Sequence, residues 1–109
     1  SMGAEVVAPG LGIYAASKSA INGFMRAVAT EQVNRGIRAN VIMASMVKTE
    51  LIDTLQSFSE EDLAKDEARY PLGYGHPEDI AYACIYLLSD ASKWMTGSLI
   101  KLDGGSTLG

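Results

Sequence analysis

One short apolar run, Ile37 to Ala44 (IRANVIMA), constrains the fold more than any other stretch of this chain. It follows a turn signal at Gly36, and it is mostly apolar with no regular alternation of apolar and polar residues. Such a run is typical of a strand that is buried on both faces, as in parallel sheets. The sequence predicts a second strand from Ser98 to Leu102, closed by a turn at Asp103-Gly104-Gly105.

Helical patterns lie before and between these strands. After an entry loop at residues 1–13, apolar residues recur at helical spacing from Tyr14 to Asn34. Residues 48–68 are polar and acidic, and they predict one or two short, mobile helices. One of these helices is expected to start at the segment SEED, whose serine, Ser59, is suited to be its N-cap. Pro77 opens a last helix. Its predicted buried face comprises Ile80, Cys84, Leu87 and Leu88.

The order of these elements predicts the sheet topology. Two strands joined through helices run parallel, with a right-handed crossover. The strand at 37–44 has the character of a central strand, yet two strands alone would leave long unpaired edges. We therefore expect an α/β fold in which the chain is the C-terminal part of a doubly wound parallel, Rossmann-like sheet, with two strands and flanking helices.

Composition narrows the classes of partner. The net charge is −4 and the basic residues are scattered, which argues against nucleic acid or an anionic membrane surface as partner. A single cysteine, Cys84, allows no internal disulfide, and the lone His76 belongs to no cluster with metal-ligand spacing, so no metal site is expected. No apolar run approaches the ~20 residues that span a bilayer and no signal peptide is visible, so a cytoplasmic location is expected.

The segment YAASKSA, residues 14–20, places Tyr14 four positions before Lys18. In a helix this spacing puts both side chains on one face. An ammonium group held near a phenol favours the phenolate form, which makes a tyrosine a better general acid or base near neutral pH. The same pair also occurs by chance in unrelated helices, so the spacing alone leaves an ordinary turn of helix open.

Further segments before and after Tyr14 and Lys18 form a recognisable order along the chain. Ser1 lies thirteen residues before Tyr14, Val47 and Thr49 follow the first strand, and the chain continues with RYPLGYGHPEDIAYACIYLLSD and TGSLIKLDGG. With these segments, essentially all 109 residues resemble the C-terminal half of the classical short-chain dehydrogenase/reductases. The resemblance implies that residues 1–109 are the C-terminal half of a single Rossmann-like domain, with a mobile substrate loop at about 48–68.

The resemblance also implies a role for each matching position. Tyr14 would be the general acid that protonates the substrate oxygen, and the base in the reverse direction. Lys18 would favour the phenolate and hydrogen-bond the nicotinamide ribose. Ser1 would polarise the substrate carbonyl and orient the tyrosine, if it is native and not the remnant of a cleaved tag, which also leaves Ser-Met. Cofactor contacts are expected from Tyr14, Lys18, Ala44, Ser45, Val47 (through its backbone) and Thr49.

The implied activity is the NAD(P)-dependent interconversion of a ketone and a secondary alcohol, with NAD or NADP as cofactor. The resemblance further implies a homodimer or homotetramer of the full-length protein, with Trp94 near a subunit contact. The family's glycine-rich pyrophosphate turn, its NAD-or-NADP selector and its catalytic asparagine would fall upstream of Ser1.

The chain departs from the family pattern at Ala44-Ser45, where the family usually carries Pro-Gly, so we expect a differently shaped turn beneath the nicotinamide. This departure leaves an alternative open, a non-catalytic protein that keeps the fold for assembly or nucleotide sensing. An epimerase or dehydratase also uses Tyr-x-x-x-Lys and remains a third reading.

Overall fold

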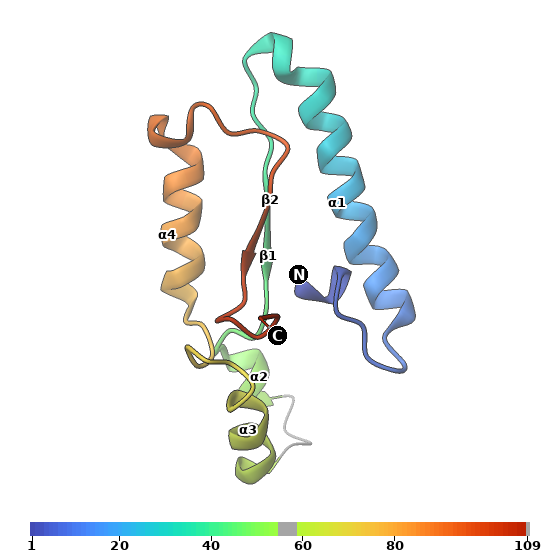
Figure 1. Cartoon of the computed structure of the whole chain (residues 1–109), viewed down its shortest axis with the longest axis vertical. Helices are drawn as coiled ribbons and strands as arrows, with labels where there is room; N and C mark the ends of the chain where they lie inside the picture. Colours follow the sequence, from blue (N-terminus) through green and yellow to red (C-terminus); the bar gives the residue numbers. More distant parts are fainter. Residues whose placement is uncertain (55–58, 109) are drawn as a thin grey trace.

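Two long helices flank a pair of parallel strands, and shorter helices gather beyond one end of them (Figure 1). This computed structural model describes residues 1–54 and 59–108, so the part of the predicted substrate loop at 55–58 lies outside the described residues. The elements are α1 (Gly12–Gln32), β1 (Val41–Ala44), α2 (Glu50–Thr54), α3 (Glu60–Glu67), α4 (Pro77–Leu88) and β2 (Leu99–Leu102), with short 3-10 turns η1 (Met2–Ala4), η2 (Val33–Arg35) and η3 (Asp90–Ser92).

The two strands pair in parallel, with Val41 opposite Leu99 and Ala44 opposite Leu102. This register confirms the predicted α/β class and the parallel crossover. Met43, in the middle of β1, is the largest side chain without solvent contact among the described residues, so the core lies around this strand. Within the described part of the chain β1 has a neighbour on one side, β2, although its apolar sequence is that of a central strand.

The prediction that β1 begins at Ile37 was wrong by four residues. No ladder is formed at residues 37–40: the Ala39 carbonyl accepts from the N–H of Gly97 at 2.7 Å, and side chains make the neighbouring contacts. The N–H of Ala39 donates to Thr96 Oγ1 at 3.1 Å, and Asn40 donates to the Met95 carbonyl at 3.0 Å. The side chains of Asn40 and Thr96 thus make hydrogen bonds to the distant segment across from residues 39–40, and the regular ladder begins only at Val41.

Arg38 ties the end of α4 to the start of β1. Its Nη2 donates to the Leu87 carbonyl at 2.8 Å and to the Ser89 carbonyl at 3.4 Å, and its Nη1 donates to the Met95 carbonyl at 3.1 Å. The last carbonyls of a helix have no partner within the helix. The guanidinium supplies those partners and fixes α4 beside the sheet.

The helix patterns were predicted more accurately than the burial of their faces. α1 begins at Gly12 and continues through η2 to the left-handed Gly36, close to the predicted bounds. Ser59 caps α3 as predicted, accepting from the N–H of Asp62 at 3.2 Å. On α4, however, Leu88 is 85% exposed, so its predicted burial was wrong. Successive helix positions are ~100° apart, and Leu88 points away from the side on which Leu87 is half-buried.

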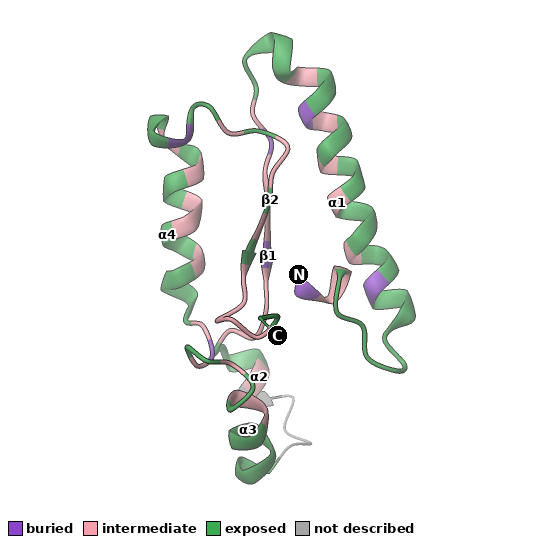
Figure 2. Ribbon diagram, viewed as in Figure 1, coloured by how far each residue is buried: buried purple, intermediate pink, exposed green. Residues whose placement is uncertain are grey.

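Much of the outer surface of α1 and α4 is exposed (Figure 2). Trp94, expected near a subunit contact, is 99% exposed. Across residues 1–54 and 59–108, no helix combines the length and apolar character that crossing a membrane requires.

The turn after β2 packs against the segment between α3 and α4. The N–H of Leu72 donates to the Gly104 carbonyl at 3.0 Å, and Gly104 has a φ of +58°. A Cβ at Gly104 would lie 2.7 Å from the Gly73 carbonyl oxygen, so the close approach of the two segments requires glycine. Asp103 closes the turn by accepting hydrogen bonds from Gly105 and Thr107. These bonds, that from the Thr107 hydroxyl first, hold the pKa of Asp103 below its usual value of 3.8.

Candidate active site

Ser1 and Tyr14 meet in front of the carboxyl end of β1. Their hydroxyl oxygens lie 3.0 Å apart. Ser1 Oγ also accepts from the N–H of Gly3 at 3.0 Å, which anchors it as the cap of η1. An added Cβ at Gly3 would lie 2.6 Å from Tyr14 Cε1, so the backbone of η1 lies directly against the phenol ring. The 3-10 turn therefore positions both hydroxyls.

Lys18 lies one helical turn after Tyr14, on the same face of α1. Its Nζ is 5.6 Å from the centroid of the Tyr14 ring, within the range of a cation–π contact. The start of the helix is held by the Ser17 hydroxyl, which donates to the Tyr14 carbonyl at 2.7 Å, and by the buried Ala15. The structure thus places the three residues predicted to be catalytic beside one another.

A cavity of about 310 Å³ opens beside this group. Ser1 and Tyr14 line it together with Ala44 and Ser45, which stand at the end of β1. Ligands of open α/β sheets bind at the carboxyl ends of the strands. Two of the residues predicted to contact the cofactor therefore share one cavity with the predicted acid and its serine partner.

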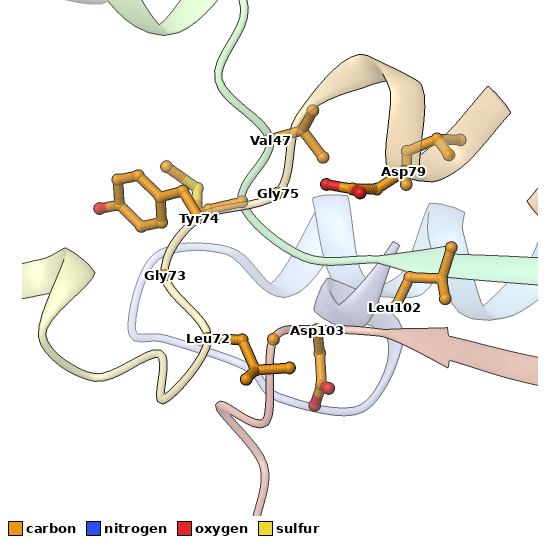
Figure 3. Close-up of a pocket in the computed structure, with 11 residues that line it drawn as sticks. Val47, Leu72, Gly73, Tyr74, Gly75, Asp79, Leu102 and Asp103 are labelled. Carbon is orange, nitrogen blue, oxygen red and sulfur yellow. The ribbon is translucent and has the colours of Figure 1, made fainter. Parts of the chain in front are cut away.

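The structure does not bring Val47 and Thr49 into that cavity. Val47 lines a neighbouring cavity of about 260 Å³. Figure 3 shows the side chains of Val47 and Asp79 near each other beside Gly75. Thr49 lines a third, more open depression beside Lys48. The turn after β1 is nevertheless fixed: the N–H of Gly75 donates to Met46 at 3.0 Å, and the N–H of Lys48 donates to Gly75 at 2.8 Å.

A second tyrosine, Tyr74, lies next to this turn but has a different chemistry. Its hydroxyl donates to Asp66 Oδ2 at 2.6 Å, and 6% of the residue is exposed. Burial, and then the hydrogen bond to Asp66, raise the pKa of Tyr74 far above its usual value of 10. Nearby, the ion pair of Lys48 with Glu67, 2.9 Å long, lowers the pKa of Glu67. Tyr74 stays protonated at neutral pH and anchors the loop, so its hydroxyl is poorly suited to act as a general base.

Sequence reasoning missed four further polar residues that line the Tyr14 cavity: Arg69, Tyr70, Ser106 and Thr107. A signal existed for the last two, because they follow β2, and the carboxyl ends of parallel strands lie at the same edge of a sheet. No local pattern marked Arg69 and Tyr70, which reach the cavity from the loop after α3. The hydroxyl of Tyr70 lies 3.1 Å from Ser45 Oγ, so Ser45, one of the two departures from the family pattern, links this loop to the turn after β1.

The chain is similar to known proteins in sequence and in fold. A family model described as "Enoyl-(Acyl carrier protein) reductase" matches residues 1–107. The NADP-dependent (R)-specific alcohol dehydrogenase of Lentilactobacillus kefiri is 36% identical over 102 residues, which cover 91% of this chain and 40% of the relative. A short-chain type dehydrogenase/reductase from Mycobacterium ulcerans superposes with a TM-score of 0.88 at 34% identity, covering 99% of this chain and 39% of that one.

A third similar protein, 4-hydroxyisoleucine dehydrogenase, was solved in complex with NADH. It is 32% identical with a TM-score of 0.91, and the match covers 100% of this chain and 45% of that one. The chain belongs to the short-chain dehydrogenase/reductase family of NAD(P)-dependent oxidoreductases. It spans about 40% of the length of the curated relative from L. kefiri.

Proposed function

We propose that the protein containing this chain is an NAD(P)-dependent oxidoreductase that interconverts a ketone and a secondary alcohol. The observation that carries the proposal is the 3.0 Å contact between the Ser1 and Tyr14 hydroxyls, with Lys18 beside the phenol ring. In this proposal residues 1–109 are the C-terminal half of a single Rossmann-like domain that carries the acid–base residues.

The residues around the turn after β1 fit the nicotinamide end of the cofactor. Val47 forms a parallel bridge with Gly75 in which the hydrogen bonds use Met46 and Lys48. The N–H and C=O of Val47 itself have no partner within the described residues, so they are free to bind a carboxamide. Ala44 and Ser45 line the cavity beside Tyr14, and we assign Lys18, next to the Tyr14 ring, to a ribose hydroxyl of the cofactor. The cofactor, when bound, supplies or accepts the hydride, which no side chain can do.

Proton transfer is assigned to Tyr14. In the reducing direction its hydroxyl donates a proton to the carbonyl oxygen as the alcohol forms, and in the oxidising direction the phenolate takes that proton back. Ser1 orients the phenol through their hydrogen bond and presents its own hydroxyl to the substrate oxygen. The ammonium of Lys18 stabilises the negative charge that the phenol acquires when its proton leaves. The remaining assignment, Thr49 as a cofactor contact, is part of the same proposal.

We also propose that the full-length protein is a homodimer or homotetramer with Trp94 at a subunit contact. The support is the exposure of large apolar side chains, 99% for Trp94 and 85% for Leu88, because isolated chains seldom leave such surface in water. Light scattering on the longest natural form, with Trp94→Ala for comparison, measures this directly. A monomeric wild-type protein contradicts it.

The main test replaces Tyr14 with phenylalanine in the longest natural form of the protein. We expect turnover of every carbonyl substrate to fall by about 10²-fold or more, since that is the usual contribution of a positioned general acid. The Kd for NADH and NADPH should stay nearly unchanged, because the hydroxyl is lost and the ring remains. Tyr82→Phe is the matched control, on the exposed face of α4. Full activity of the Tyr14→Phe protein refutes the assignment.

A further inference from the structure

The side chains that line the cavity beside Tyr14 carry a positive charge. Among the described residues that line it, Arg69 carries the one side chain that is ionised at neutral pH. The polar groups around it are hydroxyls, those of Ser1, Tyr14, Tyr70 and Ser106 among them, and the rest of the lining is apolar or backbone. A small cavity with one fixed cation and several hydroxyl donors favours a ligand that carries negative charge.

Arg69 is held in place while most of its donors stay free. Its Nη1 donates to Asp66 Oδ1 at 3.1 Å, and the other oxygen of Asp66 accepts from the Tyr74 hydroxyl at 2.6 Å. Within residues 1–54 and 59–108, Nη2 and Nε of Arg69 have no hydrogen-bond partner, and the side chain is 74% exposed. A guanidinium offers its N–H groups in a planar fork that matches two oxygens of a carboxylate or phosphate. Asp66 therefore orients the guanidinium through Nη1 and leaves Nη2 and Nε available to a ligand.

The next residue, Tyr70, ties the loop that carries Arg69 to the turn after β1. Tyr70 has its hydroxyl 3.1 Å from Ser45 Oγ, and Ser45 follows β1 at the edge of the same cavity. The ring of Tyr70 also packs edge-on against Tyr74, with centroids 5.0 Å apart. Tyr70 thus holds this loop against the turn after β1, which places Arg69 beside the cavity.

From these contacts we propose that the carbonyl substrate carries an anionic oxygen-rich group, a carboxylate or a phosphate, which Arg69 binds while Tyr14 acts on the carbonyl. The inference rests on the proposed function and adds a substrate class to it. With a volume of about 310 Å³, the cavity takes a small keto acid or keto phosphate. Arg69 binds the substrate and transition state alike, so its effect falls on KM.

The experiment measures kcat and KM for two matched pairs of substrates with the longest natural form of the protein. Acetoacetate is compared with methyl acetoacetate, and dihydroxyacetone phosphate with dihydroxyacetone, each with NADH and NADPH. The variants are Arg69→Gln and the control Arg35→Gln. Arg35 follows the far end of α1 and contacts Gln32, so its loss removes one positive charge at a distance from the cavity.

We expect the anion of one pair to exceed its neutral partner in kcat/KM, and that pair identifies a carboxylate or a phosphate as the natural group. Arg69→Gln should lower this preference by about tenfold or more, the usual effect of losing a charge-assisted hydrogen bond, through KM with kcat retained. Arg35→Gln should leave it unchanged.

Equal use of the charged and neutral ketones overturns the inference and leaves the proposed function standing. The same holds if Arg69→Gln slows both members of a pair equally, because that is the effect of a structural residue. No reduction of any of the four compounds overturns both.

Discussion

Gly104 should tolerate no side chain, because two requirements meet there. Its φ of +58° costs an L-residue roughly 1–2 kcal/mol. In addition, a Cβ would stand 2.7 Å from the Gly73 carbonyl oxygen, a backbone atom that cannot rotate out of the way. Forcing the two segments apart costs about 1–3 kcal/mol more. Gly104→Ala should therefore destabilise the fold by about 2–5 kcal/mol, before a gain of roughly 0.4–1 kcal/mol from restricting the unfolded chain.

Gly36 provides the matched control. It is also left-handed, with a φ of +74°, but a Cβ there would meet nothing within 4 Å. Gly36→Ala incurs the strain of φ and the same effect on the unfolded chain, without the collision. Urea unfolding followed by circular dichroism should thus give Gly104→Ala a loss larger by about 1–3 kcal/mol than that of Gly36→Ala. Equal losses would refute the claim that the approach of the Gly73 carbonyl is what requires glycine.

Two further substitutions probe the site and the turn. Gly3→Ala places a Cβ 2.6 Å from Cε1 of the Tyr14 ring, so we expect the ring to move and kcat to fall by about tenfold or more with little change in stability. Gly23→Ala, with nothing within 4 Å, should leave kcat unchanged, and equal activity of the two variants contradicts the expectation. Asp103→Asn tests the lowered pKa of Asp103: a carboxylate of this kind stabilises the fold above its usual pKa of 3.8 and loses that contribution as the pH falls through its lower folded-state value. The difference in urea midpoint between wild type and Asp103→Asn should be full at pH 7 and shrink below pH 3.8, and a difference independent of pH goes against this account.

The elements with strong local patterns were predictable from the sequence. α1 and α4 have helical periodicity with clear ends, at Gly36 and at Pro77, and both strands are short apolar runs. The start of β1 was not predictable from apolar character, because the side chains of Arg38 and Asn40 donate hydrogen bonds to backbone carbonyls far along the chain. Which face of a helix is buried depends on contacts that no local spacing reveals, as Leu88 shows.

In the candidate site, too, some contacts could be predicted from local spacing and others could not. Tyr14 and Lys18 are four residues apart on one helix, so their proximity follows from helix geometry alone. Ser1 was assigned through resemblance, and the structure places its hydroxyl 3.0 Å from that of Tyr14. Arg69 comes from a loop far along the chain, and its place on the cavity wall depends on the Asp66 contact. Periodicity carries no information about such tertiary contacts.

The hydrogen bond between Ser45 and Tyr70 has a consequence for protein engineering. Exchanging substrate loops between relatives is an ordinary way to transfer specificity, and it treats the loop as a separable part. Here Tyr70, just beyond the predicted substrate loop at about 48–68, is bonded to the turn after β1, at the serine that stands where the family usually carries glycine. A transplanted loop without Tyr70 would leave the Ser45 hydroxyl without this partner, and a glycine at position 45 would release Tyr70. In this protein Ser45 and Tyr70 should therefore be exchanged together, because each hydroxyl is the partner of the other.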